Sequence, residues 1–358
     1  MIRAPSTAAA PHLIFRPAAV TIHPRFPALP LALLACALLA APARAQTAVP
    51  ADTAPEPPPS HRALNLGAGG VGVSIGNSRE WTGLRLNASD HQVRQVNGVN
   101  LTVWKPKRNP RFEMNGVAVG LLAPMARRIN GVALGGLGVV GTDQVNGVAA
   151  AGLVTLAGQR LRGVGLGGLA VVGDHGIDGL AAAGLVTLSE GDVHGVTAAG
   201  LVSIVEGRHT GVSMGLVAAY TDGVLTGASV SALATAVKGE SRGLVASALV
   251  VVGHRLNGVQ AAGLAVLADS VTGVTVGGLG IEADRVRGVA VSAGRMRTSA
   301  FDGLSVAGWN EVRGPQRGLT IGLFNYAREL HGVQVGVLNY ARNNPKGLRL
   351  LPIFNIRF

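Results

Sequence analysis

Side chains that could perform acid–base chemistry or bind a metal ion are scattered through short polar segments of the sequence. The histidines of these segments are His175, His194, His209, His254 and His331, and the carboxylates are Asp143, Asp174, Glu190, Asp192 and Asp222. Paired carboxylates can act as general acid and base, and a row of imidazoles can hold a metal ion. Neighbouring segments do not repeat histidine at one fixed position, and the carboxylates follow the spacing of the turns. We therefore expect solvated turn residues, with no catalytic residue, no metal site and no cofactor site.

Glycine-rich hexamers such as GAGGVG at 67–72 imitate the loops that bind the phosphate groups of nucleotides. The chain has 52 glycines, so matches of this kind are expected from composition. No such hexamer opens a helical pattern and no Walker lysine follows one, so the sequence predicts no nucleotide site. Cys36 is the single cysteine, which excludes a disulfide or a cysteine-based metal framework within the chain.

The chain is basic, with a formal net charge of +12. The four arginines of residues 1–45, which contain no acid, account for four of these charges and leave +8 for residues 46–358. A basic surface attracts phosphate-rich partners, but the lysines and arginines form no cluster typical of nucleic-acid-binding proteins. The sequence thus predicts no nucleic-acid partner. It identifies no other partner, and components of the cell envelope or outer membrane are the candidates.

The polar segments recur because the chain from Gly83 onward is a repeat. An anchor glycine stands at positions 83, 98, 116, 131, 147, 163, 179, 195, 211, 227, 243, 258, 273, 288, 303, 318, 332 and 347. Most anchors are 15 or 16 residues apart, and a polar residue precedes each one. We expect the anchors to adopt a positive φ or a close backbone contact. On that basis Gly163→Val costs about 1–3 kcal/mol, and Asp143→Asn costs under about 0.5 kcal/mol.

Each repeat unit is an apolar half followed by a polar half. In the units from Gly116 to Gly273, the first eight positions after the anchor contain no charged residue. Ten extended residues span roughly 33 Å, and the Asn-Gly pairs of the polar halves are turn chemistry. Glycine inside a helix costs about 1 kcal/mol relative to alanine. The sequence therefore predicts a single all-β repeat domain over residues 64–358.

Two all-β architectures fit this repeat. In an antiparallel β-meander closed into a barrel each unit is one strand, whereas in a β-solenoid each unit is one coil. Units between 131 and 191 alternate between LGGLxVVG and AAAGLVTL, a period of 32 residues. Alternating strand direction explains this period, so we expect the meander. A phase shift of the apolar residues near each glycine pair resembles a corner between two faces, and it favours the β-solenoid as the alternative.

The N-terminal residues have the features of an export signal. Arg25 supplies a positive flank, the apolar run 29–41 is too short to span a bilayer, and Ala-Arg-Ala at 43–45 is a cleavage site. The sequence predicts a signal peptide over 1–45, followed by a Pro-rich disordered linker over 46–63. LLAC at 33–36 also resembles a lipobox, so lipidation at Cys36 is the alternative to cleavage after Ala45.

The last units read GLTIGLFNYAREL, GVQVGVLNYARNNPK and GLRLLPIFNIRF. They resemble bacterial surface-repeat proteins with tandem GLQIGLxN units and a terminal LPxxN-x-RF strand. The resemblance covers 318–358 and weakens across 116–317, where asparagine is missing at the seventh position. It implies an exported β-repeat at the surface or envelope, in many members a lipoprotein, and it carries no catalytic residues.

Taken together, these features predict a non-enzymatic exported repeat protein of the cell envelope or surface, with a structural apolar core and variable polar turns. The expected location is the outer membrane or cell surface, with the periplasm as the alternative. A second hypothesis is an integral outer-membrane β-barrel that passes small solutes. It depends on the terminal Phe358, on Ile356 and Phe354 alternating before it, and on strands of suitable length.

Overall fold

The computed structural model describes residues 63–104, 106 and 109–358. Contacts divide the chain into two units, Met1–Thr47 and Ala48–Phe358, and all that follows concerns the second. The predicted signal peptide, Cys36 and the linker residues 46–62 lie outside the described residues. The first strand begins at Ala63.

The described residues form β-strands and one short 3₁₀ helix, which confirms the all-β prediction. In chain order the elements are β1 (Ala63–Ala68), β2 (Val71–Gly76), β3 (Glu80–Asn87), β4 (Gln95–Thr102), β5 (Glu113–Gly120), β6 (Met125–Gly135), β7 (Gly138–Ala151), β8 (Val154–Ala157), β9 (Arg160–Gly167), β10 (Ala170–Gly173), β11 (Gly176–Ala183), β12 (Val186–Ser189), β13 (Asp192–Ala199), β14 (Val202–Val205), β15 (His209–Gly215), β16 (Ala218–Thr221), β17 (Leu225–Ser231), β18 (Ala234–Ser247), β19 (Val250–Ala262), β20 (Ala265–Gly277), β21 (Gly280–Ala341), η1 (Lys346–Leu348) and β22 (Leu350–Arg357).

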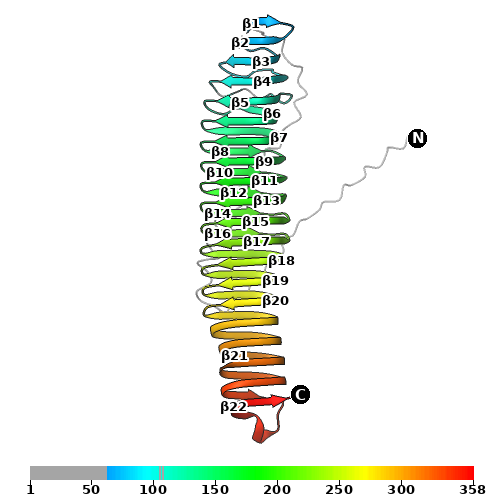
Figure 1. The fold of residues 1–358 in the computed structure, drawn as a ribbon, viewed down its shortest axis with the longest axis vertical. Coiled ribbons are helices and arrows are strands. Elements are labelled where there is room, and N and C mark those ends of the chain that lie inside the picture. The colour runs from blue at the N-terminus through cyan, green and yellow to red at the C-terminus, as the bar shows by residue number, and fades with distance from the viewer. Residues whose placement is uncertain (1–62, 105, 107–108) are drawn as a thin grey trace, which may run out of the picture. The chain divides into compact units, whose positions relative to one another are not determined.

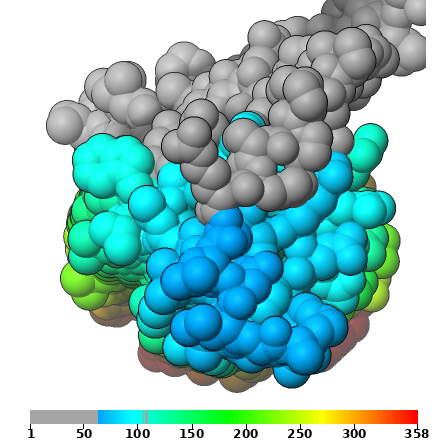
Figure 2. All heavy atoms as spheres, turned by 90° about the horizontal axis from the view of Figure 1, so that it is seen from above, coloured from blue at the N-terminus to red at the C-terminus, as the bar shows by residue number. Residues whose placement is uncertain are grey.

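These strands wind into a β-solenoid, so the expected antiparallel meander and closed barrel are wrong and the alternative is confirmed. Each repeat unit is one coil that pairs in parallel with the coil before it, as Figure 1 shows. Gly163 of β9 pairs with Gly147 of β7 on one side and with Gly179 of β11 on the other. Seen end-on from β1, later coils lie behind earlier ones (Figure 2).

The anchor glycines explain why a unit closes into a coil. Gly147, Gly163 and Gly179 have φ values of 123°, 112° and 130°, a region that side chains rarely adopt. A Cβ on Gly163 would also overlap the backbone carbonyl oxygen of Gly147. Both parts of the anchor prediction are therefore confirmed at these positions. The positive φ turns the chain at the same point of every coil, so the corners stack.

One coil has three sides, which the residues after Gly158 illustrate. Leu161 faces inward, and the next inward residue is Gly165, three residues beyond Arg162, because the chain turns at Gly163. Corners at 168–169 and 174–175 separate β10 from its neighbours. Arg160 and Arg162 project outward from the first side, whereas Val164 and Leu166 project outward from the second. Charge and apolar surface are thus segregated to different sides of the same coil.

The 32-residue alternation that suggested a meander lies on the second side. Leu134, Ala150, Leu166 and Ala182 stack in consecutive parallel coils. They occupy one column of outward positions, and Leu134 and Leu166 expose 43% and 39% of their surface. The alternation is therefore one of side-chain size along a single outer column, and it carries no information about strand direction.

Strands of reversed direction close both ends of the stack. β1 pairs antiparallel with β2, and β22 pairs antiparallel with residues 332–340 of β21. Gly72 of β2 pairs with Gly83 of β3, so the anchor series begins one unit earlier than the sequence suggested. Gly347 lies in η1 with no positive φ and with open space where a Cβ would stand, so it is not an anchor.

The interior contains two apolar clusters. One runs from Val93 to Val205 and the other from Leu225 to Ala341. Near the junction of the two clusters several inward positions are polar, and they include Thr197, Ser203 and His209. The apolar half of each unit is therefore only partly core, because inward and outward residues alternate along every side.

Candidate functional site

The structure keeps the candidate histidines apart. His194 lies 3.3 Å from Asp178, and His254 pairs with Asp269, in both cases through Nδ1 on the exposed charged side. His175 is exposed at the corner before β11 and His331 is exposed directly before the anchor Gly332, whereas His209 is fully buried. Within the described ranges, no group of three or more histidine, cysteine, aspartate or glutamate side chains could hold a metal ion.

Three of the candidate carboxylates share one column. Asp174, Glu190 and Asp222, together with Glu206, follow residues that stack in consecutive coils. Burial raises the pKa of Asp174, and Glu190 raises it further. Burial also raises the pKa of Glu206, with the charges of Glu190 and Asp222 acting in the same direction. The sequence analysis missed Glu206, although its position eleven residues after an anchor glycine identifies it.

The other two carboxylates serve the fold locally. Asp143 accepts a 3.3 Å hydrogen bond from Nε of Arg128 and lies 3.5 Å from Nε of Arg127. Asp192 accepts a 2.8 Å hydrogen bond from the backbone N–H of Arg208 on the next coil. Both carboxylates therefore connect neighbouring coils.

Polar groups interrupt the core in the middle of the solenoid. Ser203 accepts hydrogen bonds from Thr187 at 3.0 Å and Ser213 at 3.1 Å, and it donates one of 2.9 Å to Thr197. His209 lies between Val193 and Leu225 in the same inward column, and neither of its ring nitrogens has a hydrogen-bond partner. Burial lowers the pKa of His209, the backbone at Gly195 opposes this shift, and the nearby His194 adds to it.

A buried arginine ties the loop after β3 to the first coils. Arg85 is completely buried and forms an ion pair with Asp90. It donates hydrogen bonds of 2.8 Å to the side-chain oxygens of Asn100 and Asn77 and one of 3.2 Å to Ser78. Arg85 uses these hydrogen-bond donors to bind other residues of the protein. We therefore interpret the network as one that holds the loop after β3 in place.

The phosphate-loop mimic GAGGVG lies in the β1–β2 hairpin. Gly69 and Gly70 form its turn with φ values of 61° and 79°, a combination typical of two-residue hairpin loops. The next element is strand β2, so the expectation that this hexamer does not open a helix is confirmed.

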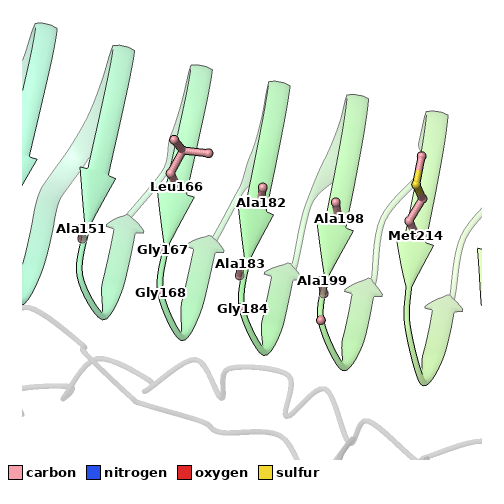
Figure 3. A pocket seen from close by; sticks show the side chains of 11 residues that line it. Ala151, Leu166, Gly167, Gly168, Ala182, Ala183, Gly184, Ala198, Ala199 and Met214 are labelled. Carbon is pink, nitrogen blue, oxygen red and sulfur yellow. The ribbon is translucent and has the colours of Figure 1, made fainter.

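Exposed leucines form an apolar feature of the outer surface. Leucines occupy the corner after the second side in most central coils, and hydrogen bonds from Leu169 N to Leu153 O and from Leu185 N to Leu169 O hold them in register. Their exposed fractions are 43% at Leu169 and 40% at Leu185. Beside this corner, alanines and glycines line a shallow hollow of about 490 Å³ between Leu166 and Met214 (Figure 3). Sequence reasoning placed these leucines in the core, because hydropathy alone does not distinguish inward from outward residues.

Among the residues that the structure describes, no helix is long and apolar enough to cross a membrane. Comparison with known proteins gives no relative: no protein-family model, curated protein or solved structure matches this chain.

Proposed function

We propose that this chain is a non-enzymatic, exported repeat protein of the cell envelope or surface. The observation that carries the proposal is the constant coil with a changing charged side. Anchor glycines and inward residues repeat from coil to coil, whereas the residue before the anchor is Arg162, Asp178, His194 and Thr210 in four consecutive coils. A scaffold that holds its backbone fixed while its outer polar residues vary is suited to presenting a recognition surface.

Two features of the sequence support export. The segment 25–45 combines a basic flank, a short apolar run and an Ala-Arg-Ala site. The units over 318–358 resemble exported bacterial surface-repeat proteins with GLQIGLxN units. In the structure, the asparagines of these units extend a buried ladder that begins one unit earlier, at Asn310, seven residues after Gly303, so asparagine is not missing at this position throughout 116–317. Asn310 Nδ2 donates to Asn325 Oδ1 at 2.8 Å, and Asn325 Nδ2 donates to Asn339 Oδ1 at 2.7 Å.

The second hypothesis required a closed barrel to pass solutes. Parallel stacking of coils replaces that barrel, and the coil interior is filled by side chains such as Leu161, Val171 and Ile177. Phe358 is not part of a barrel seam, since it follows the capping strand β22 and exposes 92% of its surface.

The location is tested by fractionating the native host and determining the mature N-terminus by mass spectrometry. The proposal expects an N-terminus at Gln46 or a lipidated Cys36, and removal of the chain by protease added to intact cells. Protection from external protease together with release on osmotic shock identifies a periplasmic protein instead. A cytoplasmic chain that retains Met1 contradicts the proposal.

A further inference from the structure

The positive charge of the chain is concentrated in its last four coils and the capping strand. Residues 285–358 contain 11 lysines and arginines but only three acids, so their formal net charge is +8. Residues 46–284 contain 16 of each kind and are neutral. The whole excess charge of residues 46–358 therefore lies in the orange and red part of Figure 1. A charge gathered at one end of the solenoid points to an anionic partner at that end.

Three arginines stack on the third side of these coils. Each asparagine of the buried ladder is followed three residues later by an arginine, which gives Arg313, Arg328 and Arg342. The backbone N–H of Arg342 donates a 3.0 Å hydrogen bond to the carbonyl oxygen of Ala327, which places Arg342 beside Arg328. All three side chains are exposed. Neighbouring coils are about 4.8 Å apart, so these charges lie closer together than the Debye length of about 8 Å at physiological salt.

The acids on this side neutralise only part of the arginine column. Glu311 accepts a 2.8 Å hydrogen bond from Nε of Arg313 and a 3.4 Å bond from Nε of Arg297. Arg328 and Arg342 form no ion pair with any residue that the structure describes. Their charges face solvent uncompensated. A second copy placed on the same face by a two-fold axis would bring like charges together, which disfavours it as the partner.

Apolar and aromatic side chains border the arginine column. At the corner before the third side, Leu323, Phe324 and Val337 expose 57%, 49% and 61% of their surface. The rings of Tyr326 and Tyr340 stack with their centroids 5.5 Å apart and their planes 4° apart. Each ring therefore covers one face of the other. Aromatic and apolar side chains beside cationic ones are typical of residues at the boundary between a membrane and water.

We propose that the third side of the last three coils, with the corner beside it, docks on the surface of an anionic lipid bilayer. The arginines bind headgroup phosphates, and the corner side chains enter the boundary between headgroups and acyl chains. A soluble polyanion would use the charges but leave the exposed apolar corner without a partner. Single-stranded nucleic acid would need open ring faces on which bases stack, and the pairing of Tyr326 with Tyr340 covers one face of each. The inference goes beyond the proposed function and does not depend on export.

The first test removes the two unpaired charges. Each basic residue near an anionic leaflet strengthens binding about fivefold, so Arg328→Gln combined with Arg342→Gln should lower the partition coefficient about 30-fold. Arg328→Lys combined with Arg342→Lys keeps the charges and should keep most of the binding. Arg208→Gln combined with Arg255→Gln is the matched control, because both side chains are exposed and lie at least three coils from the face. This control should change binding by less than about twofold. Sedimentation of the full chain with vesicles of phosphatidylcholine and phosphatidylglycerol measures all four chains.

The second test detects lipid contact locally at Trp309. This side chain is 46% exposed at the same corner, one coil before Phe324. In a Trp104→Phe background, vesicles of brominated phosphatidylcholine and phosphatidylglycerol should quench Trp309, since Trp81 is buried in the first coils. Phe324→Ser should lower the partition coefficient measured by this quenching about tenfold, as expected when roughly half of an aromatic side chain is no longer buried. Leu169→Ser, at the corner of a central coil, is the control and should leave the quenching unchanged.

Three outcomes overturn the proposal. Equal vesicle binding by the parent and by the chain with Arg328→Gln and Arg342→Gln shows that the column does not hold lipid. Polyphosphate binding that requires both arginines, without quenching of Trp309 by vesicles, assigns the face to a soluble polyanion. Oligomers that form without lipid and dissociate in the same double variant assign it to acidic residues of a second copy. Arg328 and Arg342 are exposed and unpaired, so these variants should melt like the parent when followed by circular dichroism.

Discussion

The anchor glycines are the residues on which the coil depends most directly. Gly163→Ala places a Cβ against the carbonyl oxygen of Gly147 and forces alanine into a φ of 112°. Both neighbouring coils hold this backbone, so we expect a loss of about 2–6 kcal/mol from strain and overpacking combined, and this estimate replaces the lower one that the sequence analysis gave for Gly163→Val. Gly347→Ala is the matched control, because no atom lies within 4 Å of the added Cβ, and it should change stability by under about 0.5 kcal/mol. Thermal melts compare the two variants, and equal melting temperatures would contradict the structural role of the anchors.

His209 provides a pH-dependent weakness at the residue scale. Its folded-state pKa is lowered by burial, so the unfolded chain binds the proton more readily. Stability should therefore be complete above the ordinary histidine pKa of about 6.5 and decrease as pH falls below it. His209→Leu matches the neighbouring Leu225, removes two unpaired nitrogens and should abolish this part of the pH dependence. Urea denaturation between neutral and mildly acidic pH tests this, with exposed His175→Gln as the control. An identical pH slope in His209→Leu and the parent would refute the assignment.

The sequence predicts the role of the anchor glycines well and that of His209 poorly. It identifies the anchors from Gly83 to Gly332 because their period and neighbours repeat. The sequence analysis wrongly counts Gly347 as an anchor, because the residues around it match the repeat pattern. In the structure, Pro345 and η1 redirect the chain at this point. The sequence analysis treats His209 as a solvated turn residue, because burial depends on which side of a coil the residue faces and polarity alone does not reveal it.

At the scale of elements, two asparagine ladders illustrate how burial determines the contribution of a side-chain hydrogen bond to the free energy of unfolding. Asn325 is buried, and it connects Asn310, Asn339 and the carbonyl oxygen of Val335. Asn325→Ala leaves several buried groups unpaired, so a loss of about 2–4 kcal/mol is expected. Asn130 occupies an outer ladder, where water can replace its bonds to Asn115 and Asn146. Asn130→Ala should cost about 1 kcal/mol or less.

Hydrogen exchange measured by mass spectrometry can localise these effects. In a repeat stack the loss falls on the changed coil and its neighbours. Faster exchange near residues 310–339 in Asn325→Ala, with little change in Asn130→Ala, is the expected result. Uniform destabilisation along the chain would show that the coils unfold as one cooperative unit.

The elements themselves were predictable, but their pairing was not. Regular turns, Val-rich segments and glycine within every candidate helix indicate strands. A unit of 15–16 residues can make one long strand with a turn or one complete coil, and both place apolar residues at the same spacing. The alternation of Leu166 with Ala182 suggested reversed strand directions, whereas the structure stacks these residues in parallel. The sequence predicted a special backbone conformation at Gly163, but it did not reveal that the turn there begins a second side of the same coil and does not reverse the strand.

For the whole solenoid, the strands at its ends protect it from unwanted pairing. β22 carries Pro352, a register shift opposite 336–339 and a positive φ at Ile353, all of which make it a poor template for a further strand. Deleting residues 350–358 exposes the flat parallel edge at 332–340, so we expect aggregation detected by light scattering. Deleting Phe358 alone removes a residue that is 92% exposed and should leave solubility unchanged. Equal solubility of both truncated chains would show that β22 is not a protective cap.

The constant register between coils also has a consequence for how such a chain can change over generations. A one-residue difference is absorbed by an irregularity in the polar part of the coil, as between Val237 and Glu240, where a 16-residue coil meets a 15-residue coil. Gain or loss of the segment 163–178 joins equivalent corners and leaves all other coils in place. Recombination between similar coding segments therefore changes such a chain most readily in whole coils. We expect homologous genes to differ in copy number, so that the heritable quantity is a count of coils, each adding about 4.8 Å.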